Sequence, residues 1–289
     1  MGWLIFIAIL AAAAAALCIW ETSHFKVVRY VVNAKKLQKS HRFVFISDLH
    51  SCCYGSNNEK LVRAVLDLEP EAVLIGGDML VGKKGADGNV ALAFLEQLTG
   101  KMPIYYVNGN HESRMHQNPE YFGDGYQLYL HGLEQLGVIL LNDRSIPYPN
   151  DEGLQLSGVE LEDIYYQKRK RAVMESEIMQ KKLGKPDCGK FQLLLAHSPA
   201  YSRQYAQWGA NLVLAGHYHG GIVGLPGNRG LISTQYKLFE KCSRGIFSIG
   251  KDVTGEEQNM IVSAGMGTHT IKVRLFNPQQ LICLDLKKD

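Results

Sequence analysis

Five short motifs along the chain combine residue types that bind metal ions in proteins. They are Asp48-Leu49-His50, Gly77-Asp78, Gly109-Asn110-His111-Glu112, His197 and Gly216-His217-Tyr218-His219. Together they supply two aspartates, five histidines and one asparagine as candidate donors, with no cysteine among them. This nitrogen and oxygen donor set suits manganese, iron, zinc or cobalt better than a thiolate zinc site would.

The number of donors indicates two ions rather than one. The candidate metal ligands are Asp48, His50, Asp78, Asn110, His197, His217 and His219. Seven side chains are too many for a single ion, whereas two ions that share a carboxylate form the clamp used for displacement at phosphorus. Asp48 and His50 are one residue apart, so a chain turning out of a strand can present both to one ion.

Each motif alone also has an ordinary structural explanation. A single D-x-H or H-x-H is common by chance, and Gly-Asp or Asn-Gly after a strand usually forms a turn. The conjunction is more specific, because each motif follows a predicted strand. The other histidines are expected to be surface or core residues, with only His116 and His269 retained as contacts at the rim of the site. These histidines are His24, His41, His116, His131 and His269.

Runs rich in Val, Ile and Leu predict the buried strands that would position the motifs. They cover residues 43–47, 72–76, 104–107, 138–141, 191–196, 211–215, 260–263 and 281–286. Amphipathic stretches at 58–68 and 90–98 predict crossover helices, so the fold class is α/β. The carboxyl ends of parallel strands meet at one edge, where the five loops are expected to converge. Residues 164–183 are rich in Lys, Arg, Glu and Met, which predicts a surface helix.

The N-terminus predicts one membrane helix. Residues 2–20 carry no charged side chain and include six alanines at 11–16. Nineteen such residues in a helix span roughly 28 Å, close to the hydrocarbon thickness of a bilayer. The alternative of a cleaved signal peptide stays open, although no basic residue precedes the apolar run. A lipoprotein site at Cys18 is not favoured, because Leu17 stands where a small residue is expected.

The charge balance separates this segment from the rest of the chain. The whole sequence of 289 residues has net charge +3, with 46% hydrophobic and 20% charged residues, which excludes disordered and multi-span membrane classes. Residues 1–42 hold six basic and one acidic side chain, and the remainder carries a slight negative charge. No nucleic-acid partner is expected at a pI of about 8.4. We predict an anchor at 1–20, a basic juxtamembrane linker at 21–42 and one domain at 43–289.

The same charges predict the side of the membrane and the redox environment. Because the basic residues all follow the helix, the positive-inside rule places the C-terminal domain in the cytoplasm, with the external side as the alternative. Six cysteines without a framework spacing favour free thiols in a reducing compartment.

The five motifs resemble those of the calcineurin-like metallophosphoesterases, whose pattern is D-x-H, G-D, G-N-H-[DE], H and G-H-x-H. Matching residues extend from Asp48 to His219. Ser243-Arg244-Gly245 and Arg274-Leu275-Phe276-Asn277-Pro278 also resemble the bacterial branch that carries an N-terminal membrane segment. The resemblance implies a four-layer α/β/β/α sandwich of two mixed sheets.

The resemblance also implies a role for each motif residue. One divalent ion would be held by Asp48, His50, Asp78 and His219, and the other by Asp78, Asn110, His197 and His217. Manganese is favoured for both ions, with iron, zinc or cobalt as alternatives. A bridging hydroxide would attack phosphorus while Asn110 binds phosphoryl oxygens, and His111 would protonate the leaving oxygen or stabilise its charge.

The activity implied is hydrolysis of a phosphodiester or pyrophosphate, with the tether favouring a lipid-linked or envelope-precursor substrate such as a UDP-diacylglucosamine-like compound. The alternatives are a broad phosphomonoesterase and, from another class, a non-catalytic metal-dependent scaffold. A protein phosphatase is not expected, because the G-D-x-x-D-R-G motif of those enzymes is replaced by Gly77-Asp78-Met79-Leu80-Val81-Gly82. Arg114 is either a phosphate clamp or an ordinary exposed arginine, and Glu112 is expected to brace its loop.

Overall fold

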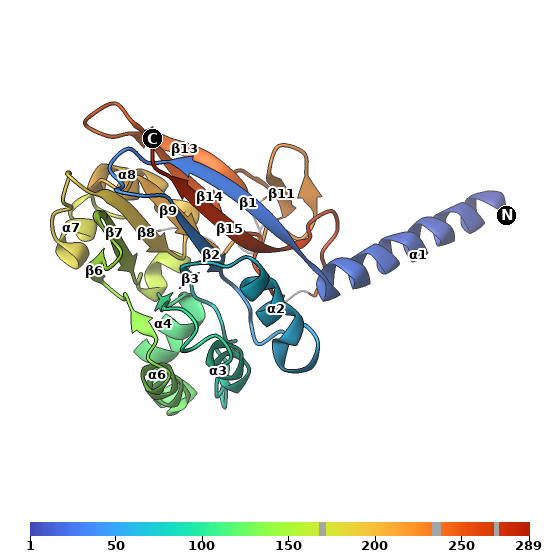
Figure 1. Ribbon diagram of the computed structural model, residues 1–289. Coiled ribbons are helices and arrows are strands. Elements are labelled where there is room, and N and C mark those ends of the chain that lie inside the picture. Colours follow the sequence, from blue (N-terminus) through green and yellow to red (C-terminus); the bar gives the residue numbers. More distant parts are fainter. Residues whose placement is uncertain (168–171, 233–237, 269–271) are drawn as a thin grey trace.

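Two six-stranded sheets stack face to face, and helices cover the outer face of each (Figure 1). This arrangement confirms the expected four-layer α/β/β/α sandwich. The computed structural model describes residues 1–167, 172–232, 238–268 and 272–289. A 22-residue helix, α1 (Gly2–Ser23), projects from the sandwich at the N-terminus (Figure 1).

The first sheet has the order β1-β15-β2-β3-β4-β5. Its strands are β1 (Phe25–Asn33), β15 (Gln279–Lys287), β2 (His41–Ile46), β3 (Ala72–Ile75), β4 (Ile104–Tyr106) and β5 (Ile139–Leu140). All neighbours pair in parallel except β15 and β2, so β1 and β15 run opposite to the other four strands. The helices of this half are α2 (Glu59–Asp67), α3 (Asn89–Glu96), α4 (Asn110–Gln117), α5 (Pro119–Phe122) and α6 (Gly125–Gln135), with a 3-10 turn at Ser56–Asn58.

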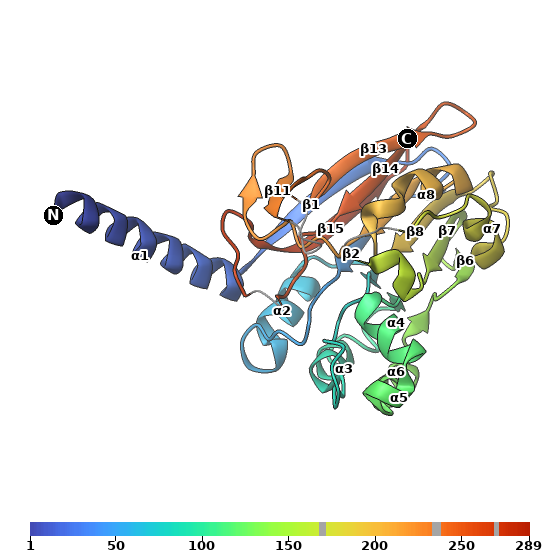
Figure 2. The same cartoon turned by 180° about the vertical axis from the view of Figure 1, so that it is seen from behind.

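The second sheet has the order β13-β14-β9-β8-β7-β6. Its strands are β13 (Gly245–Lys251), β14 (Glu257–Val262), β9 (Leu212–Ala215), β8 (Phe191–Ala196), β7 (Asp151–Val159) and β6 (Arg144–Tyr148). Helices α7 (Glu177–Leu183) and α8 (Ser202–Trp208) lie over it in the view from behind, together with 3-10 turns at Asp163–Tyr166 and Pro199–Tyr201 (Figure 2). A small separate sheet is formed by β10 (Gly224–Leu225), β11 (Arg229–Ile232) and β12 (Leu238–Glu240).

The apolar strands are buried on both faces, which explains why their sequences read as continuous apolar runs. On β2, Phe43 and Phe45 pack between the sheets, whereas Val44 and Ile46 pack under the helices. Successive side chains on a strand point to opposite faces, so one run contributes to two cores. Each fully buried side chain of this size stabilises the fold by about 1.5 to 3 kcal/mol. All eight predicted strands are present, with ends that differ by a few residues.

The segment predicted as a linker contains a strand, which corrects that prediction. Strand β1 pairs in parallel with β15 over its whole length, from Phe25 opposite Gln279 to Asn33 opposite Lys287. Its basic side chains favoured the linker interpretation, yet they are accommodated at the sheet edge. Arg29 lies 3.6 Å from the Asp285 carboxylate, and Arg42 on β2 donates to the same group at 2.8 Å.

The predicted surface helix at 164–183 is also wrong over most of its length. Only α7 at its C-terminal end is an α-helix, and residues 168–171 lie outside the described residues. Tyr165, Tyr166 and Met174 are buried with Met179 in the core beneath the second sheet. Packing of these large side chains overrides the helical propensity of the segment.

The predicted N-terminal helix is present and ends three residues later than expected, at Ser23. It is long and apolar enough to cross a membrane, with a mean hydropathy of 2.6 over an 18-residue window that is not buried by the domain. Glu21 is the one buried residue in this helix. All six cysteines are free thiols, as predicted from their spacing.

Candidate metal centre

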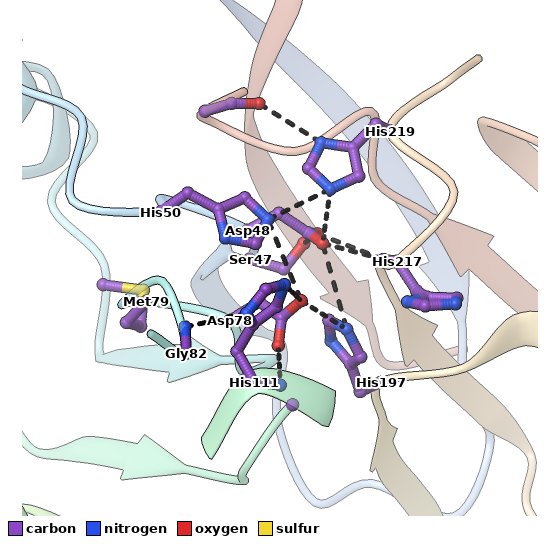
Figure 3. Close-up of polar contacts among 12 residues, drawn as sticks. Ser47, Asp48, His50, Asp78, Met79, Gly82, His111, His197, His217 and His219 are labelled. Carbon is purple, nitrogen blue, oxygen red and sulfur yellow. Dashed lines mark hydrogen bonds and ion pairs between the residues drawn. The ribbon is translucent and has the colours of Figure 1, made fainter. Parts of the chain in front are cut away.

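The motif residues converge at the carboxyl ends of the central strands. Asp48 follows β2, Asp78 follows β3, His197 follows β8 and His217 follows β9. The seven predicted ligand side chains are all buried. Six of them lie together at these strand ends (Figure 3), namely Asp48, His50, Asp78, His197, His217 and His219.

One group of donors contains Asp48, His50 and His219. The Nε2 atom of His219 lies 3.2 Å from Oδ1 of Asp48 and 3.1 Å from Nε2 of His50. Candidate donor atoms of all three residues lie within 4.8 Å of one another. Because two imidazoles and a carboxylate converge at such distances, they can ligate one divalent ion.

A second group contains Asp78, His197 and His217, whose candidate donor atoms also lie within 4.8 Å of one another. Nε2 of His197 is 3.2 Å from Oδ2 of Asp78. Asn110 begins α4 and is buried, and its Oδ1 atom has no hydrogen-bond partner among the described residues. A buried carbonyl oxygen without a partner is unusual, and a metal ion would satisfy it.

Asp78 lies between the two groups. Its Oδ2 atom is 3.2 Å from His197 in one group and 3.8 Å from Nε2 of His50 in the other. Oδ1 accepts a hydrogen bond from the backbone N–H of His111 at 2.8 Å, which fixes the orientation of the carboxylate. This placement suits a carboxylate shared by two ions.

Backbone carbonyls set the tautomers of two histidines. Nδ1 of His197 lies 2.7 Å from the Gly76 carbonyl, and Nδ1 of His219 lies 3.2 Å from the Gly267 carbonyl. Because a carbonyl only accepts, each Nδ1 carries a proton, and each Nε2 faces an aspartate and is the atom that would bind a metal ion once deprotonated. Metal-bound histidines usually have such a partner on the second nitrogen, so these residues fit a metal site.

The buried charged groups of the site favour binding of a cation. Burial alone would lower the pKa of His197, but the Asp78 and Asp48 carboxylates outweigh it and raise this pKa to about 10. Burial and the neighbouring His197 lower the pKa of His217 to about 3, so that ring stays a neutral ligand. Two buried carboxylates therefore attract positive charge, which divalent ions would supply.

The ligands occupy strained backbone positions. Asp48, His50, Asp78, His217 and His219 have φ angles between 48° and 68°, in the left-handed region. Non-glycine residues adopt this region at a cost of about 1 kcal/mol or more each, and such residues cluster at functional sites. Two glycines allow the motif loops to pack closely against the aspartates. A Cβ at Gly109 would collide with the Asp78 carboxylate, and a Cβ at Gly216 would collide with the Asp48 carboxylate.

A family comparison agrees with this geometry. The family model for the calcineurin-like phosphoesterases matches residues 41–221, which contain every donor described above. The chain belongs to this family.

Two bacterial relatives extend the similarity beyond the matched segment. An uncharacterized metallophosphoesterase of Helicobacter pylori is 30% identical over 87% of this chain, and one of Aquifex aeolicus is 26% identical over 92%. The chain spans 61% of the first relative and 94% of the second. A Bos taurus protein named as a transmembrane protein with a metallophosphoesterase domain is 27% identical over 64% of this chain, which covers 41% of it.

In this calcineurin-like phosphoesterase, His111 faces the donor groups from α4. Its Nε2 atom lies 3.9 Å from Oδ2 of Asp78, and its Nδ1 atom accepts the backbone N–H of Gly82 at 2.8 Å (Figure 3). Because Nδ1 accepts, the neutral ring carries its proton on Nε2, on the side of the aspartate. Burial lowers the pKa of His111, which favours that neutral form.

Glu112 braces the loops of the family motifs, in agreement with the sequence-based expectation. One carboxylate oxygen accepts the backbone N–H groups of Asp78 and Gly109 at 2.9 and 3.0 Å. The other accepts the Met79 N–H at 2.8 Å and the Tyr106 hydroxyl at 3.0 Å. Glu112 is therefore a positioning residue that holds the second and third motifs together.

The remaining candidates have structural partners. Arg114 donates to the Asp163 carboxylate at 2.9 and 3.0 Å, as an ordinary exposed arginine would. His41 is buried between carboxylates, and His116 stacks on Tyr126 at an exposed position of α4. His269 lies outside the described residues.

Several residues that touch the donors or their loops were not predicted from the sequence. The Gly82 N–H and the Gly76 carbonyl orient His111 and His197, and a backbone group leaves no signal in residue types. Arg274 and Asn277 contact the His219 loop and were visible in the sequence only as part of a C-terminal resemblance.

Proposed function

We propose that the chain hydrolyses phosphoesters with two divalent metal ions, manganese being favoured. The observation that carries this proposal is the pair of donor groups on either side of Asp78, with His111 beside them. Asp48, His50, Asp78 and His219 would hold one ion, and Asp78, Asn110, His197 and His217 the other. Bound there, the ions would lower the pKa of a water nucleophile and neutralise phosphoryl oxygens.

The side chains around the ions would orient the substrate and handle the leaving group. Asn110 begins α4, so its side-chain amide and the N–H groups at the helix N-terminus could both bind a phosphoryl oxygen. His111 presents Nε2–H towards the same space and can donate it to the leaving oxygen. The Gly82 N–H donates to Nδ1 of His111, which leaves the proton of the neutral ring on Nε2.

The finer proposal is a phosphodiester or pyrophosphate substrate linked to a lipid, such as a UDP-diacylglucosamine-like compound. Its support is the position of α1 relative to the donors. The first residue of β1, Phe25, pairs with Gln279, and Phe45 on β2 pairs with Ile282. The pairing of Phe45 with Ile282 lies near the carboxyl end of β2, and the pairing of Phe25 with Gln279 lies three residues closer to the start of β15, so β1 starts at the same end of the sheet as the ligands that follow β2. Helix α1 therefore leaves the first sheet at the end of the strands where the metal ligands lie.

If α1 crosses a membrane, the end of the first sheet that carries the metal ligands lies close to the bilayer surface. Strands are about 4.8 Å apart, so β1 and β2, separated by β15, lie roughly 10 Å apart. A phosphate linked to a membrane lipid would lie at the bilayer surface, close to that end of the sheet. We also propose that the domain is on the cytoplasmic side, because the basic residues follow α1 in the sequence.

The proposal is tested with full-length protein in lipid nanodiscs loaded with manganese. We expect hydrolysis of bis-p-nitrophenyl phosphate to exceed that of p-nitrophenyl phosphate, and a lipid-linked pyrophosphate to be cleaved faster than a water-soluble nucleotide pyrophosphate. Preference for p-nitrophenyl phosphate would favour the phosphomonoesterase alternative. Inactivity with every divalent metal despite stoichiometric binding would favour the scaffold. The full chain is needed because removal of residues 1–42 would delete β1 from the first sheet.

A further inference from the structure

The buried end of α1 is connected to the loop that carries His219. The loop before β15 lies beside the base of α1 in both ribbon views (Figures 1 and 2). The carboxylate of Glu21, on the last turns of α1, accepts the backbone N–H of Asn277 at 3.0 Å. Glu21 is only 7% exposed, although nearly all of the helix around it is exposed.

Asn277 continues this connection towards the metal centre. Its buried side-chain amide donates to the backbone carbonyl of His219 at 2.6 Å and to that of Gly221. Its Oδ1 atom accepts from Arg244 at 2.8 Å. A Cβ at Gly220 would collide with the same Oδ1, so the loop and the amide fit closely. One asparagine thus contacts both the membrane-helix end and the His219 loop.

Arg274 supports the same ligand from the other side. Its guanidinium is 1% exposed and donates to the carbonyls of Ala264 and Gly267 at 2.7 and 2.8 Å. The Gly267 carbonyl is also the acceptor for Nδ1 of His219, so Arg274 holds the group that fixes this tautomer. A second nitrogen of Arg274 donates to the Asn277 carbonyl at 3.3 Å.

We propose that Glu21, Asn277 and Arg274 are positioning residues for His219, so that the base of α1 forms part of the support of one metal site. The inference rests on the metal ligation assigned under the proposed function. The chain holds His219 in a left-handed backbone conformation with φ of 51°, which needs external support. Partners that orient metal-bound histidines typically contribute 10- to 100-fold to metal affinity. Arg274 holds the carbonyl that orients His219, and Asn277 holds the backbone of the His219 loop.

The test measures manganese binding to full-length protein in nanodiscs, by electron paramagnetic resonance and elemental analysis. A His217→Ala background leaves the Asp48 group as the intact site, and a His219→Ala background leaves the Asp78 group. We expect Asn277→Ala to weaken manganese binding about 10- to 100-fold in the first background and to leave it unchanged in the second. Equal weakening in both backgrounds, or in neither, would overturn the proposal.

A matched control separates positioning from general destabilisation. Asn211 is likewise a buried asparagine that bonds to backbone, but it precedes β9 at the opposite end from His217. Asn211→Ala should lower the melting temperature without changing manganese affinity. If Asn277→Ala does not fold, Glu21→Ala serves instead, with a weakening of about three- to tenfold expected in the His217→Ala background. Unchanged binding in that variant would contradict the coupling to α1.

These measurements do not depend on turnover. If the wild-type chain binds two manganese ions but hydrolyses no phosphoester, the proposed function fails while the positioning role is still measurable. If the chain hydrolyses phosphodiesters and Asn277→Ala binds manganese like wild type, only the positioning role fails.

Discussion

The two halves of the metal centre draw their support from different parts of the chain. The Asp78 half is braced from within residues 41–221, by Glu112 and by the Gly76 carbonyl. The Asp48 half is braced on its His219 side by Gly267, Arg274 and Asn277, and through Asn277 by α1. Every one of these latter supports lies outside residues 41–221, the segment that matches the family.

This difference separates support that lies inside the family-matched segment from support that lies outside it. The Asp78 half is held by contacts among residues close to the motifs. The His219 side of the other half depends on a C-terminal loop and on α1. Changes outside residues 41–221 are therefore expected to weaken the Asp48 site more than the Asp78 site. The following variants test the two halves.

The largest effect is expected from Asp78→Asn, because Asp78 lies 3.8 Å from a histidine in one group and 3.2 Å from a histidine in the other, and is the proposed shared ligand. Loss of its charge should reduce metal content to one ion or none and lower phosphodiesterase activity by about 10⁴-fold or more, since each ion contributes several kcal/mol. Elemental analysis and hydrolysis of bis-p-nitrophenyl phosphate measure the two effects.

Asp151→Asn is the control for this variant. Asp151 is also buried and lies 2.9 Å from a histidine, His41, but it is outside the metal centre. This change should reduce stability while leaving two bound ions. Two ions at wild-type affinity in Asp78→Asn would refute a shared carboxylate.

His111→Ala should retain both ions yet lose about 10²- to 10⁴-fold in turnover, because the Nε2–H donor to the leaving oxygen is gone. The loss should be greatest for substrates with poor leaving groups. A comparison of rates on esters of graded leaving-group pKa measures this. Arg114→Ala, on the same helix but paired with Asp163, should have nearly wild-type rates. Loss of an ion in His111→Ala would instead assign His111 as a ligand.

Glu112→Ala tests the half that is braced by its own motifs. It leaves several buried N–H donors without an acceptor, which should cost about 3 kcal/mol or more in the free energy of unfolding. Urea denaturation with and without manganese measures the loss. Tyr106→Phe removes a single donor to Glu112 and should cost only about 1 kcal/mol. A Glu112→Ala chain as stable as Tyr106→Phe would show that Glu112 is not the brace.

Much of the fold could be predicted because the central strands are buried on both faces. Phe43 to Ile46 and the residues of β8 form continuous apolar runs that few other structures would accommodate. Strand β1 escaped prediction, because at a sheet edge Lys26 and Arg29 are tolerated and resemble a solvated linker. The helix predicted across 164–183 failed because burial of Tyr165 and Met174 depends on contacts with a distant sheet.

The candidate ligands could be predicted because their position after strands is a local property of the sequence. The contacts that orient them could not, because they join segments far apart in the chain. Glu21 and Asn277 are separated by 256 positions, and nothing in the composition of either segment relates them. Backbone groups such as the Gly82 N–H are present at every non-proline residue, so only the fold selects the one that matters.

The exit of α1 beside the metal ligands has a consequence for kinetics. An enzyme whose site is held at the depth of lipid headgroups encounters its substrate by diffusion in two dimensions. Its rate on a lipid-linked phosphoester would then follow the mole fraction of that lipid in the bilayer, and dilution with inert lipid at constant bulk concentration would slow turnover. Water-soluble esters would show no such surface dilution.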